Sequence, residues 1–401
     1  MNRSTKRHEI FEMLLLTDLA QAPSRSNTNR DNLGAPRLAG LVIKASRVRR
    51  RACLFQISPG EPPVFRTVSA TAILIAIAAP SASMAADLTV YTALESDLLP
   101  VYQESFEAAN PDINIQWVRD STGVITAKLL AEKDNPQADV VLGTAATSLL
   151  LLKSEGMLDA FAPTGMEKLD PRFVDQDQPP YWVGTNAWSA ALCVNTVEME
   201  NHQLPMPTSW ADLTKPEYKG FIVMPNPASS GTGFLDVSSW LQMMGEEKGW
   251  AFMDALHQNV ATYTHSGSKP CTLAAAGEYP IGISFEFRAA KLSAEGAPIV
   301  AVIPSEGIGW DMEASAIVNG TDEPEAAKAL LDWAVSDAAM AIYAQNYAIL
   351  ANQSLEKPIE GLPTDIRDKL IKNDFEWAAN NRAEILDQWQ AKYDSKTEPA
   401  G

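Results

Sequence analysis

Strand and helix patterns alternate in the stretch of sequence that begins at Leu88. Apolar and polar residues alternate where a strand is expected, and apolar residues recur three or four positions apart where a helix is expected. The expected elements are strands at 88–92, 113–118 and 138–142 and helices at 98–110 and 124–133. The order β-α-β-α-β predicts a parallel sheet with helices on both faces, so the chain is of the α/β class.

The same pattern returns in the second half of the chain. Strands are expected at 188–195, 220–224, 281–285 and 297–303, and helices at 210–213, 234–244, 325–346 and 364–393. The strand at 188–195 is long enough to connect two lobes.

Residues 1–86 differ from the rest of the chain in charge and pattern. They are net basic, whereas the whole chain carries a net charge of −18. The apolar core at 71–80, followed by small residues up to Ala86, is typical of a secretory signal peptide, and it is too short for a membrane span, which needs about 20 residues. We expect export to the periplasm with cleavage after Ala85 or Ala86. Our hypothesis is that translation starts further along the chain and that residues 1–63 come from a start site assigned too far upstream.

The remaining chain is strongly acidic and holds Cys193 and Cys271. Such a charge argues against nucleic acid or an anionic membrane as its main partner. In an oxidising compartment the two cysteines can form one disulfide, and the sequence leaves open whether they pair or stay as buried thiols. No CxxC pair or clustered His accompanies them, which argues against a metal site.

Two segments combine hydroxyl residues with Gly where a strand gives way to a helix. A helix N-terminus offers free N–H groups and a partial positive charge, so such segments can bind an anion. Either one alone is more simply a helix cap, but two that face each other across two lobes favour a tetrahedral anion. The candidate contacts are Ser121, Thr122, Gly123, Ser229, Ser230, Gly231 and Thr232.

A third polar loop, at 265–269, either adds the hydroxyls of Ser266 and Ser268 to this site or is a solvated turn. Arg288 and Lys128 are more simply explained as solvated surface bases.

Acidic and aromatic residues are candidates for holding an amine on the same ligand. Glu286 lies between two Phe residues at the end of a strand, and Asp311 and Glu313 follow a Trp. Trp188 can offer an aromatic face to an ammonium group, although a Trp is more often a core residue.

Signatures of catalysis are missing from residues 87–401. The three His residues have no metal-binding spacing, and there is neither a Gly-x-Ser-x-Gly elbow nor a phosphate loop. We therefore expect neither an enzyme nor a cofactor.

The chain resembles the extracellular solute-binding proteins of ABC importers, in the branch that includes ferric-iron binders. Four segments carry this resemblance: VYTALE (90–95), NPQADVVLG (135–143), PTSWADLTKPEYKG (207–220) and LLDWAVSDAAMAIYAQN (330–346). Within that branch, four further segments resemble the 2-aminoethylphosphonate-binding proteins: 118–133, 224–254, 264–271 and 370–382.

The resemblance implies a two-lobed type II periplasmic binding protein. Each lobe is expected to be a mainly parallel sheet flanked by helices, with the ligand in the cleft between the lobes. Residues 87–190 would form the first lobe and 196–307 the second, while 308–401 would return to the first lobe and end in helices. The hinge strands are expected near 190–195 and 308–314.

The function implied is capture of 2-aminoethylphosphonate by a monomer and delivery to the membrane permease of an ABC transporter. We expect the phosphonate on the hydroxyl and N–H groups, and the amine against Glu286 and aromatic rings. Another small anion, such as a sugar phosphate or phosphate ester, or Fe(III) is the alternative ligand. A secreted enzyme acting on a phosphorus compound is the alternative of a different class.

One departure from the iron binders bears on these alternatives. Iron-binding relatives have two adjacent tyrosines where this chain has Phe285-Glu286-Phe287, so the phenolate ligands of Fe(III) are lost. Glu95 and Thr144 fall where some iron binders have a His and a Glu. Together with Thr92, they complete the candidate ligand contacts.

Overall fold

The structure, a computed structural model, describes residues 85–399. The predicted signal peptide, with its apolar core at 71–80, and residues 1–63, whose translation the sequence analysis doubts, lie outside this range. Among the residues described, no helix combines the length and apolar character needed to cross a membrane.

Parallel strands form the centre of the first lobe. Strand β1 (Ala86–Thr92) lies between β2 (Ile113–Arg119) and β3 (Val140–Ala145) and pairs parallel with both. Strand β10 (Trp310–Val318) adds an antiparallel neighbour to β3, and the short β4 (Leu158–Asp159) pairs with β10. The lobe therefore has the parallel core expected from the sequence, within a mixed sheet.

Helices cover this sheet and pack through aromatic side chains. On α1, the Tyr102 ring lies 5.1 Å from that of Tyr343 and 6.1 Å from that of Trp333. These contacts hold α1 against α9 and α10. The helices of the lobe are α1 (Leu99–Ala109), α2 (Thr122–Ala131), α3 (Ala146–Ser154), α9 (Pro324–Ala334) and α10 (Asp337–Tyr343).

The second lobe repeats this plan. Strand β6 (Ile222–Pro225) lies between β7 (Val260–Thr264) and β8 (Ile281–Phe285) and pairs parallel with both. The helices of the lobe are α4 (Thr196–Asn201), α5 (Gly231–Met244), α6 (Glu246–Asn259), α7 (Lys269–Ala275) and α8 (Glu286–Ala294).

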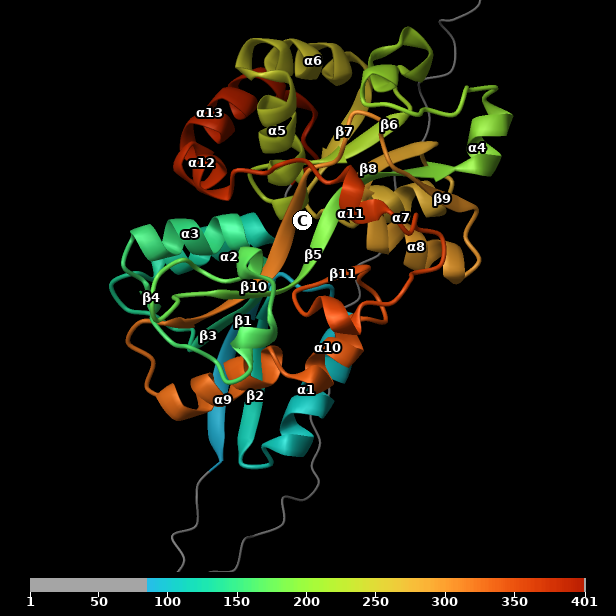
Figure 1. The fold of residues 1–401 in the computed structure, drawn as a ribbon. Coiled ribbons are helices and arrows are strands. Elements are labelled where there is room, and N and C mark those ends of the chain that lie inside the picture. The colour runs from blue at the N-terminus through green and yellow to red at the C-terminus, as the bar shows by residue number, and fades with distance from the viewer. Residues whose placement is uncertain (1–84, 400–401) are drawn as a thin grey trace, which may run out of the picture. The chain divides into compact units, whose positions relative to one another are not determined.

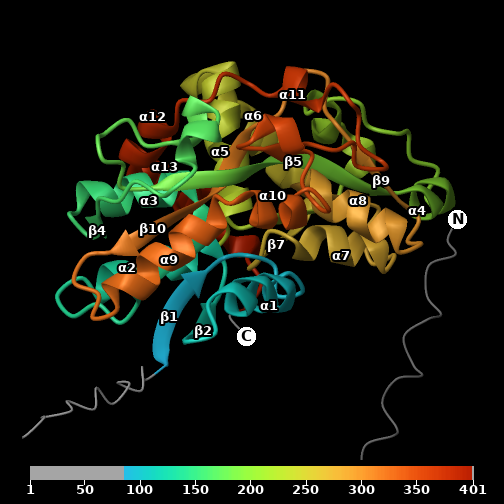
Figure 2. The same ribbon diagram turned by 60° about the horizontal axis from the view of Figure 1, so that its bottom comes forward.

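Strand β5 (Val183–Asn195) joins the two lobes, and all of its residues are buried. Its residues 183–189 pair with β10, and β11 (Ile349–Leu350) also joins this part. Its residues 190–195 pair with β8 and β9 (Ile299–Val302). The sheet order is therefore β2-β1-β3-β10-β5-β8-β6-β7 (Figure 1). Figure 2 shows β5 running from the side of α3 to the side of α8.

The C-terminal segment crosses back to the second lobe. Helix α11 (Ile366–Lys369) is followed by α12 (Phe375–Asn380) and α13 (Arg382–Tyr393). The hydroxyl of Tyr393 donates a hydrogen bond of 2.8 Å to Asp254 on α6. The sequence led us to expect that residues 308–401 return to the first lobe. The structure has β10, α9 and α10 there, and α12 packs against α3 of that lobe, whereas α13 contacts α5 and α6 beside the second sheet (Figure 1).

Two expected helices are divided in the structure. The helix expected over 325–346 is split into α9 and α10 because the Ser336 hydroxyl caps α10, accepting a hydrogen bond of 3.2 Å from the Ala339 N–H. The helix expected over 364–393 is split into α11, α12 and α13. Short 3₁₀ helices lie at Met166–Lys168, Pro171–Phe173, Ala211–Thr214, Pro216–Tyr218, Gln353–Leu355 and Asp394–Lys396.

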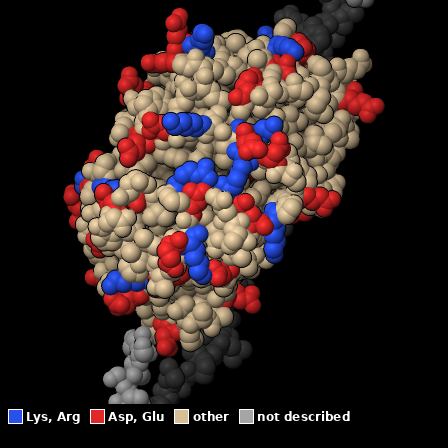
Figure 3. All heavy atoms as spheres, in the orientation of Figure 1, with Lys and Arg blue, Asp and Glu red and all other residues tan. Residues whose placement is uncertain are grey.

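Charged side chains are dispersed over the face drawn in Figure 3. Acidic and basic groups alternate there, and the basic groups do not form one continuous patch.

A disulfide joins β5 to α7 in the second lobe. Cys193 and Cys271 are both fully buried, with their Cα atoms 5.2 Å apart and 78 residues apart in sequence. Of the two possibilities that the sequence left open, the structure has the paired cysteines. A cross-link over a loop of this length restricts the unfolded chain strongly.

We predict that the double variant Cys193→Ala/Cys271→Ala is less stable than the wild type by about 2–4 kcal/mol, because the unfolded chain regains its freedom. Chemical denaturation with and without a reducing agent measures this difference. Reductant should destabilise the wild type and leave the variant unchanged. Equal stability of wild type and variant under oxidising conditions would contradict the prediction.

Candidate functional site

A pocket lies between the two lobes and encloses about 460 Å³ of space, open solvent included. Both lobes and the connecting strand β5 contribute to its lining: Ala93, Glu95, Arg119, Ser121, Thr122, Trp188, Ser230, Gly231, Thr232, Ser266, Gly267, Phe285, Phe287 and Glu313.

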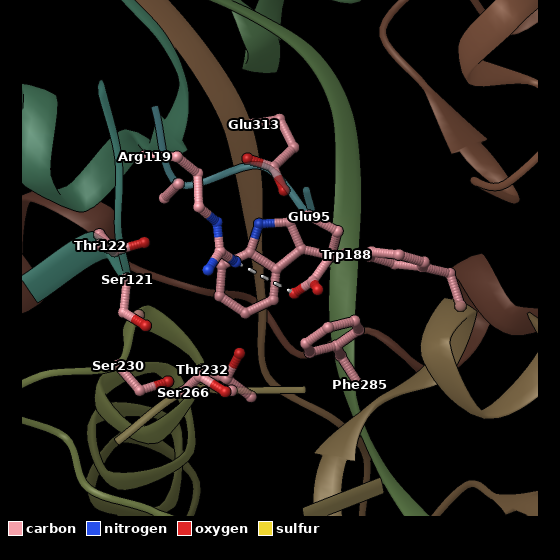
Figure 4. A pocket seen from close by; sticks show the side chains of 14 residues that line it. Glu95, Arg119, Ser121, Thr122, Trp188, Ser230, Thr232, Ser266, Phe285 and Glu313 are labelled. Carbon is pink, nitrogen blue, oxygen red and sulfur yellow. Dashed lines mark ion pairs between the residues drawn. The ribbon is translucent and has the colours of Figure 1, made fainter. Parts of the chain in front are cut away.

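Hydroxyl groups from both lobes gather at one side of the pocket (Figure 4). Ser121 and Thr122 stand at the N-terminus of α2, and neither hydroxyl accepts a capping hydrogen bond from that helix. Ser230 and Thr232 stand at the N-terminus of α5, and Ser266 lies in the loop before α7. Two helix N-termini and five hydroxyl groups provide the donors that a tetrahedral anion needs.

Two glycines allow these helix termini to meet. The Gly123 N–H donates a hydrogen bond of 2.9 Å to the Ser229 carbonyl of the other lobe. A Cβ atom at Gly123 would lie 2.1 Å from the Ala228 carbonyl oxygen, and one at Gly231 would lie 2.6 Å from Thr122 Oγ1. A larger residue at either position would separate the lobes at this edge of the pocket.

Arg119 is the basic side chain in the pocket lining, and the sequence analysis missed it. Its Nε donates a hydrogen bond of 2.9 Å to the Leu94 carbonyl, and its guanidinium lies 3.8 Å from Glu95. The side chain is 29% exposed, so it has donors left for a ligand. One signal could have identified it, since Arg119 ends a parallel strand just before the hydroxyl segment, and ligands bind at the carboxyl ends of such strands.

Ion pairs bridge the lobes on another side of the pocket. Arg288 on α8 binds Glu95 at 2.6 Å and Asp97 at 3.3 Å, and Lys291 also pairs with Asp97. Arg288 is only 11% exposed, so the expectation that it is a solvated surface base is wrong. Lys128, in contrast, is 41% exposed and pairs with Glu132 on its own helix.

Glu313 on β10, one of the acidic candidates for an amine, also lines the pocket. Burial, together with the charges of Asp311 and Glu95, raises the pKa of Glu313 well above its usual range. In Figure 4 its carboxylate lies above Trp188, away from Ser230, Thr232 and Ser266.

Several residues selected from the sequence lie outside the pocket lining. Asp311 caps α3, accepting hydrogen bonds from the Ala146 N–H at 3.0 Å and the Thr147 hydroxyl at 2.8 Å. Thr92 accepts a hydrogen bond from the Leu94 N–H at 3.1 Å. The others outside the lining are Gly123, Thr144, Ser229, Ser268 and Glu286.

Glu286 is fully buried, whereas its neighbours Phe285 and Phe287 line the pocket. One of its oxygens accepts a hydrogen bond of 2.6 Å from the Ser189 N–H on β5, and the other has no partner among residues 85–399. Burial raises the pKa of Glu286 to about 7. Its position suits a structural role behind the pocket wall better than direct contact with a ligand.

No group of three or more His, Cys, Asp or Glu side chains within residues 85–399 is placed to hold a metal ion.

Sequence comparisons relate the chain to bacterial binding proteins. A family described as bacterial extracellular solute-binding protein matches residues 135–374. An uncharacterized protein of Haemophilus influenzae is 30% identical over 80% of this chain and 94% of its own length. A probable ABC transporter periplasmic-binding protein of Sinorhizobium fredii, y4fP, is 27% identical over 76% of this chain and 85% of its own length.

Solved structures share the fold. One is the periplasmic binding protein AfuA of Actinobacillus pleuropneumoniae, with fructose-6-phosphate bound. Its TM-score is 0.73 and its sequence identity 28%, and the match covers 77% of this chain and 99% of the AfuA chain. Iron-bound HitA of Pseudomonas aeruginosa has a TM-score of 0.65 at 16% identity, over 76% of this chain and 99% of its own. The α/β periplasmic-binding fold expected from the sequence is thus confirmed.

We predict that Glu286→Gln stabilises the protein at neutral and alkaline pH. The pKa of Glu286 is about 7 in the folded protein and about 4.5 in the unfolded chain, so the folded state favours the protonated acid. The stability that comes from this preference is complete below pH 4.5 and is lost as the pH rises through 7. An amide does not ionise, so Glu286→Gln does not lose this stability at high pH. Its free energy of unfolding should exceed that of the wild type by up to about 3 kcal/mol above pH 7 and by little near pH 4. Denaturation across this pH range measures the gain.

The matched control for this prediction is Glu325→Gln, which changes a side chain that is 86% exposed. It should leave stability unchanged at every pH. A Glu286→Gln variant that is no more stable than the wild type at pH 8 would contradict the prediction.

Proposed function

Because the chain belongs to the family of bacterial extracellular solute-binding proteins, we propose that it is the periplasmic substrate-binding component of an ABC importer. Its proposed ligand is 2-aminoethylphosphonate, which it binds as a monomer and delivers to the membrane permease. The observation that carries this proposal is the meeting of hydroxyl groups from both lobes at two helix N-termini beside Arg119.

The hydroxyl side of the pocket suits the phosphonate group. Ser121 and Thr122 reach it from one lobe, and Ser230, Thr232 and Ser266 from the other. Arg119 adds a charge-assisted donor, which is roughly twice as strong as a neutral one. The similar protein AfuA binds fructose-6-phosphate, whose phosphate has the same tetrahedral oxygen arrangement.

The acidic side of the pocket suits an amine. Glu95 and Glu313 both line it, and they would repel a second anionic group. A zwitterion has a positive group for this side and a negative group for the other. Fructose-6-phosphate has no positive group, so the two carboxylates favour the aminophosphonate over a sugar phosphate. The sugar phosphate is the second candidate, since the similarity to AfuA supports it.

Closure of the cleft follows from the same contacts. A phosphonate that binds donors of both lobes stabilises the conformation in which the lobes meet, and the closed form presents a distinct surface to the permease. The segments proposed to bend are 190–195, within β5, and 308–314, which includes the first half of β10.

We predict that 2-aminoethylphosphonate raises the melting temperature of the purified protein more than phosphate, fructose-6-phosphate or ferric citrate does. A ligand that binds only the folded state stabilises it by RT ln(1 + [L]/Kd). A thermal-shift panel of these compounds measures the effect. A larger shift with fructose-6-phosphate would favour the sugar phosphate, and a larger shift with ferric citrate would favour iron.

We predict that Arg119→Ala weakens binding of 2-aminoethylphosphonate by about tenfold or more, because a hydrogen bond to a charged group contributes about 1.5–3 kcal/mol. Isothermal titration calorimetry measures the change. The control is Arg172→Ala, which removes an arginine that is 54% exposed, pairs with Asp170 and lies outside the pocket lining. If both variants bind as the wild type does, Arg119 does not contact the ligand.

A further inference from the structure

We infer that Glu313 determines the specificity of the pocket for ligands that carry an amine, by binding the ligand's ammonium group. The inference rests on the proposed function and names the residue that separates an aminophosphonate from other phosphonates. It differs from the sequence expectation, which assigned the amine to Glu286.

Glu313 is the carboxylate of the pocket lining that the protein leaves without a partner. Its side chain has no hydrogen bond or ion pair to any residue in the 85–399 range, and Arg119 is the one basic group whose charge acts on it at longer range. The other carboxylate of the lining, Glu95, is held by Arg288 at 2.6 Å. A carboxylate that is half-buried and unpaired is costly, and a cation from the ligand removes that cost.

The nearby acids are already engaged. Both oxygens of Asp311 accept hydrogen bonds at the N-terminus of α3. Glu286 is fully buried and binds the Ser189 N–H, so a ligand in the pocket cannot reach it without moving the wall. Glu313 is therefore the acid best placed to meet a ligand.

Polar groups around Glu313 also lack partners among the described residues. Asn186 pairs with Glu313 across β5 and β10, so the two side chains lie on the same face of the sheet, and Asn186 Nδ2 is buried without a partner. The Tyr102 and Tyr347 hydroxyls are likewise buried without partners. Burial, and then the negative charge of Glu313, raises the pKa of Tyr347, so its phenol stays a neutral donor near the carboxylate. Together these groups form a polar niche within an otherwise apolar core.

The niche lies at the opposite side of the pocket from the hydroxyl groups of the second lobe. In Figure 4 Glu313 and the hydroxyls of Ser230, Thr232 and Ser266 lie on opposite sides of the Trp188 ring. A short ligand with a negative group at one end and an ammonium at the other can therefore meet both. The Trp188 ring between them offers an aromatic face to the ammonium.

The test compares 2-aminoethylphosphonate with ethylphosphonate, which has the same anionic group without the amine. Isothermal titration calorimetry gives both affinities for the wild type, Glu313→Gln and Glu313→Asp. We expect Glu313→Gln to lose about tenfold or more of its affinity for 2-aminoethylphosphonate while ethylphosphonate binds at least as well as before. Glu313→Asp keeps the charge and should retain part of the preference for the amine. Glu325→Gln, a surface change, serves as the control and should bind both compounds as the wild type does.

The outcomes separate the two levels of the proposal. A wild type that binds neither compound overturns the proposed function, and this inference with it. A wild type that binds 2-aminoethylphosphonate while Glu313→Gln loses affinity for both compounds equally overturns this inference alone, because the residue then only maintains the pocket. An unchanged preference for the amine in Glu313→Gln also overturns it. Melting temperatures of the unliganded variants establish that each one is folded.

Discussion

Strand β5 holds the two lobes together. Its first half is hydrogen-bonded to β10 and its second half to β8 and β9, so one buried strand carries both lobes. The pocket lies where this change of partners occurs, and Trp188 and Phe285 beside that point both line it. Because the register of a strand is set by its hydrogen bonds, the walls of the pocket are held in place by the sheet itself. The parallel strands then bring the N-termini of α2 and α5 to the cleft.

The electrostatics of the pocket are local. The chain has a net charge of −18, so overall charge does not attract an anion. The groups that favour an anion are instead two helix N-termini and five hydroxyls on one side, while Glu95 and Glu313 make the other side acidic and Arg119 lies beside Glu95. Glu95 has a second role, since it joins Arg119 in one lobe to Arg288 in the other. The same carboxylate, Glu95, therefore lines the pocket and takes part in the contact between the lobes.

Part of the candidate site could be predicted from the sequence and part could not. Ser121 and Ser230 were found because hydroxyl residues beside Gly at a strand-to-helix change have a local signature. Arg119 has only its position at the end of a parallel strand, and Glu313 could not be told apart from the neighbouring Asp311, because the sequence does not show which of these side chains faces the cleft. Glu286 and Asp311 were selected for their chemistry, but Glu286 turns to Ser189, and Asp311 caps a helix that the sequence analysis had not identified.

Local periodicity and turn chemistry were enough to predict the α/β class, most of the strands and the segments that bring hydroxyls to helix N-termini. Tertiary structure alone decided the disulfide pairing, the division of the C-terminal helices between the lobes and the choice of acid facing the pocket. Those features depend on residues far apart in the chain. Successive side chains at the end of β8 point in different directions, so Phe285 and Phe287 face the cleft while Glu286 faces the core.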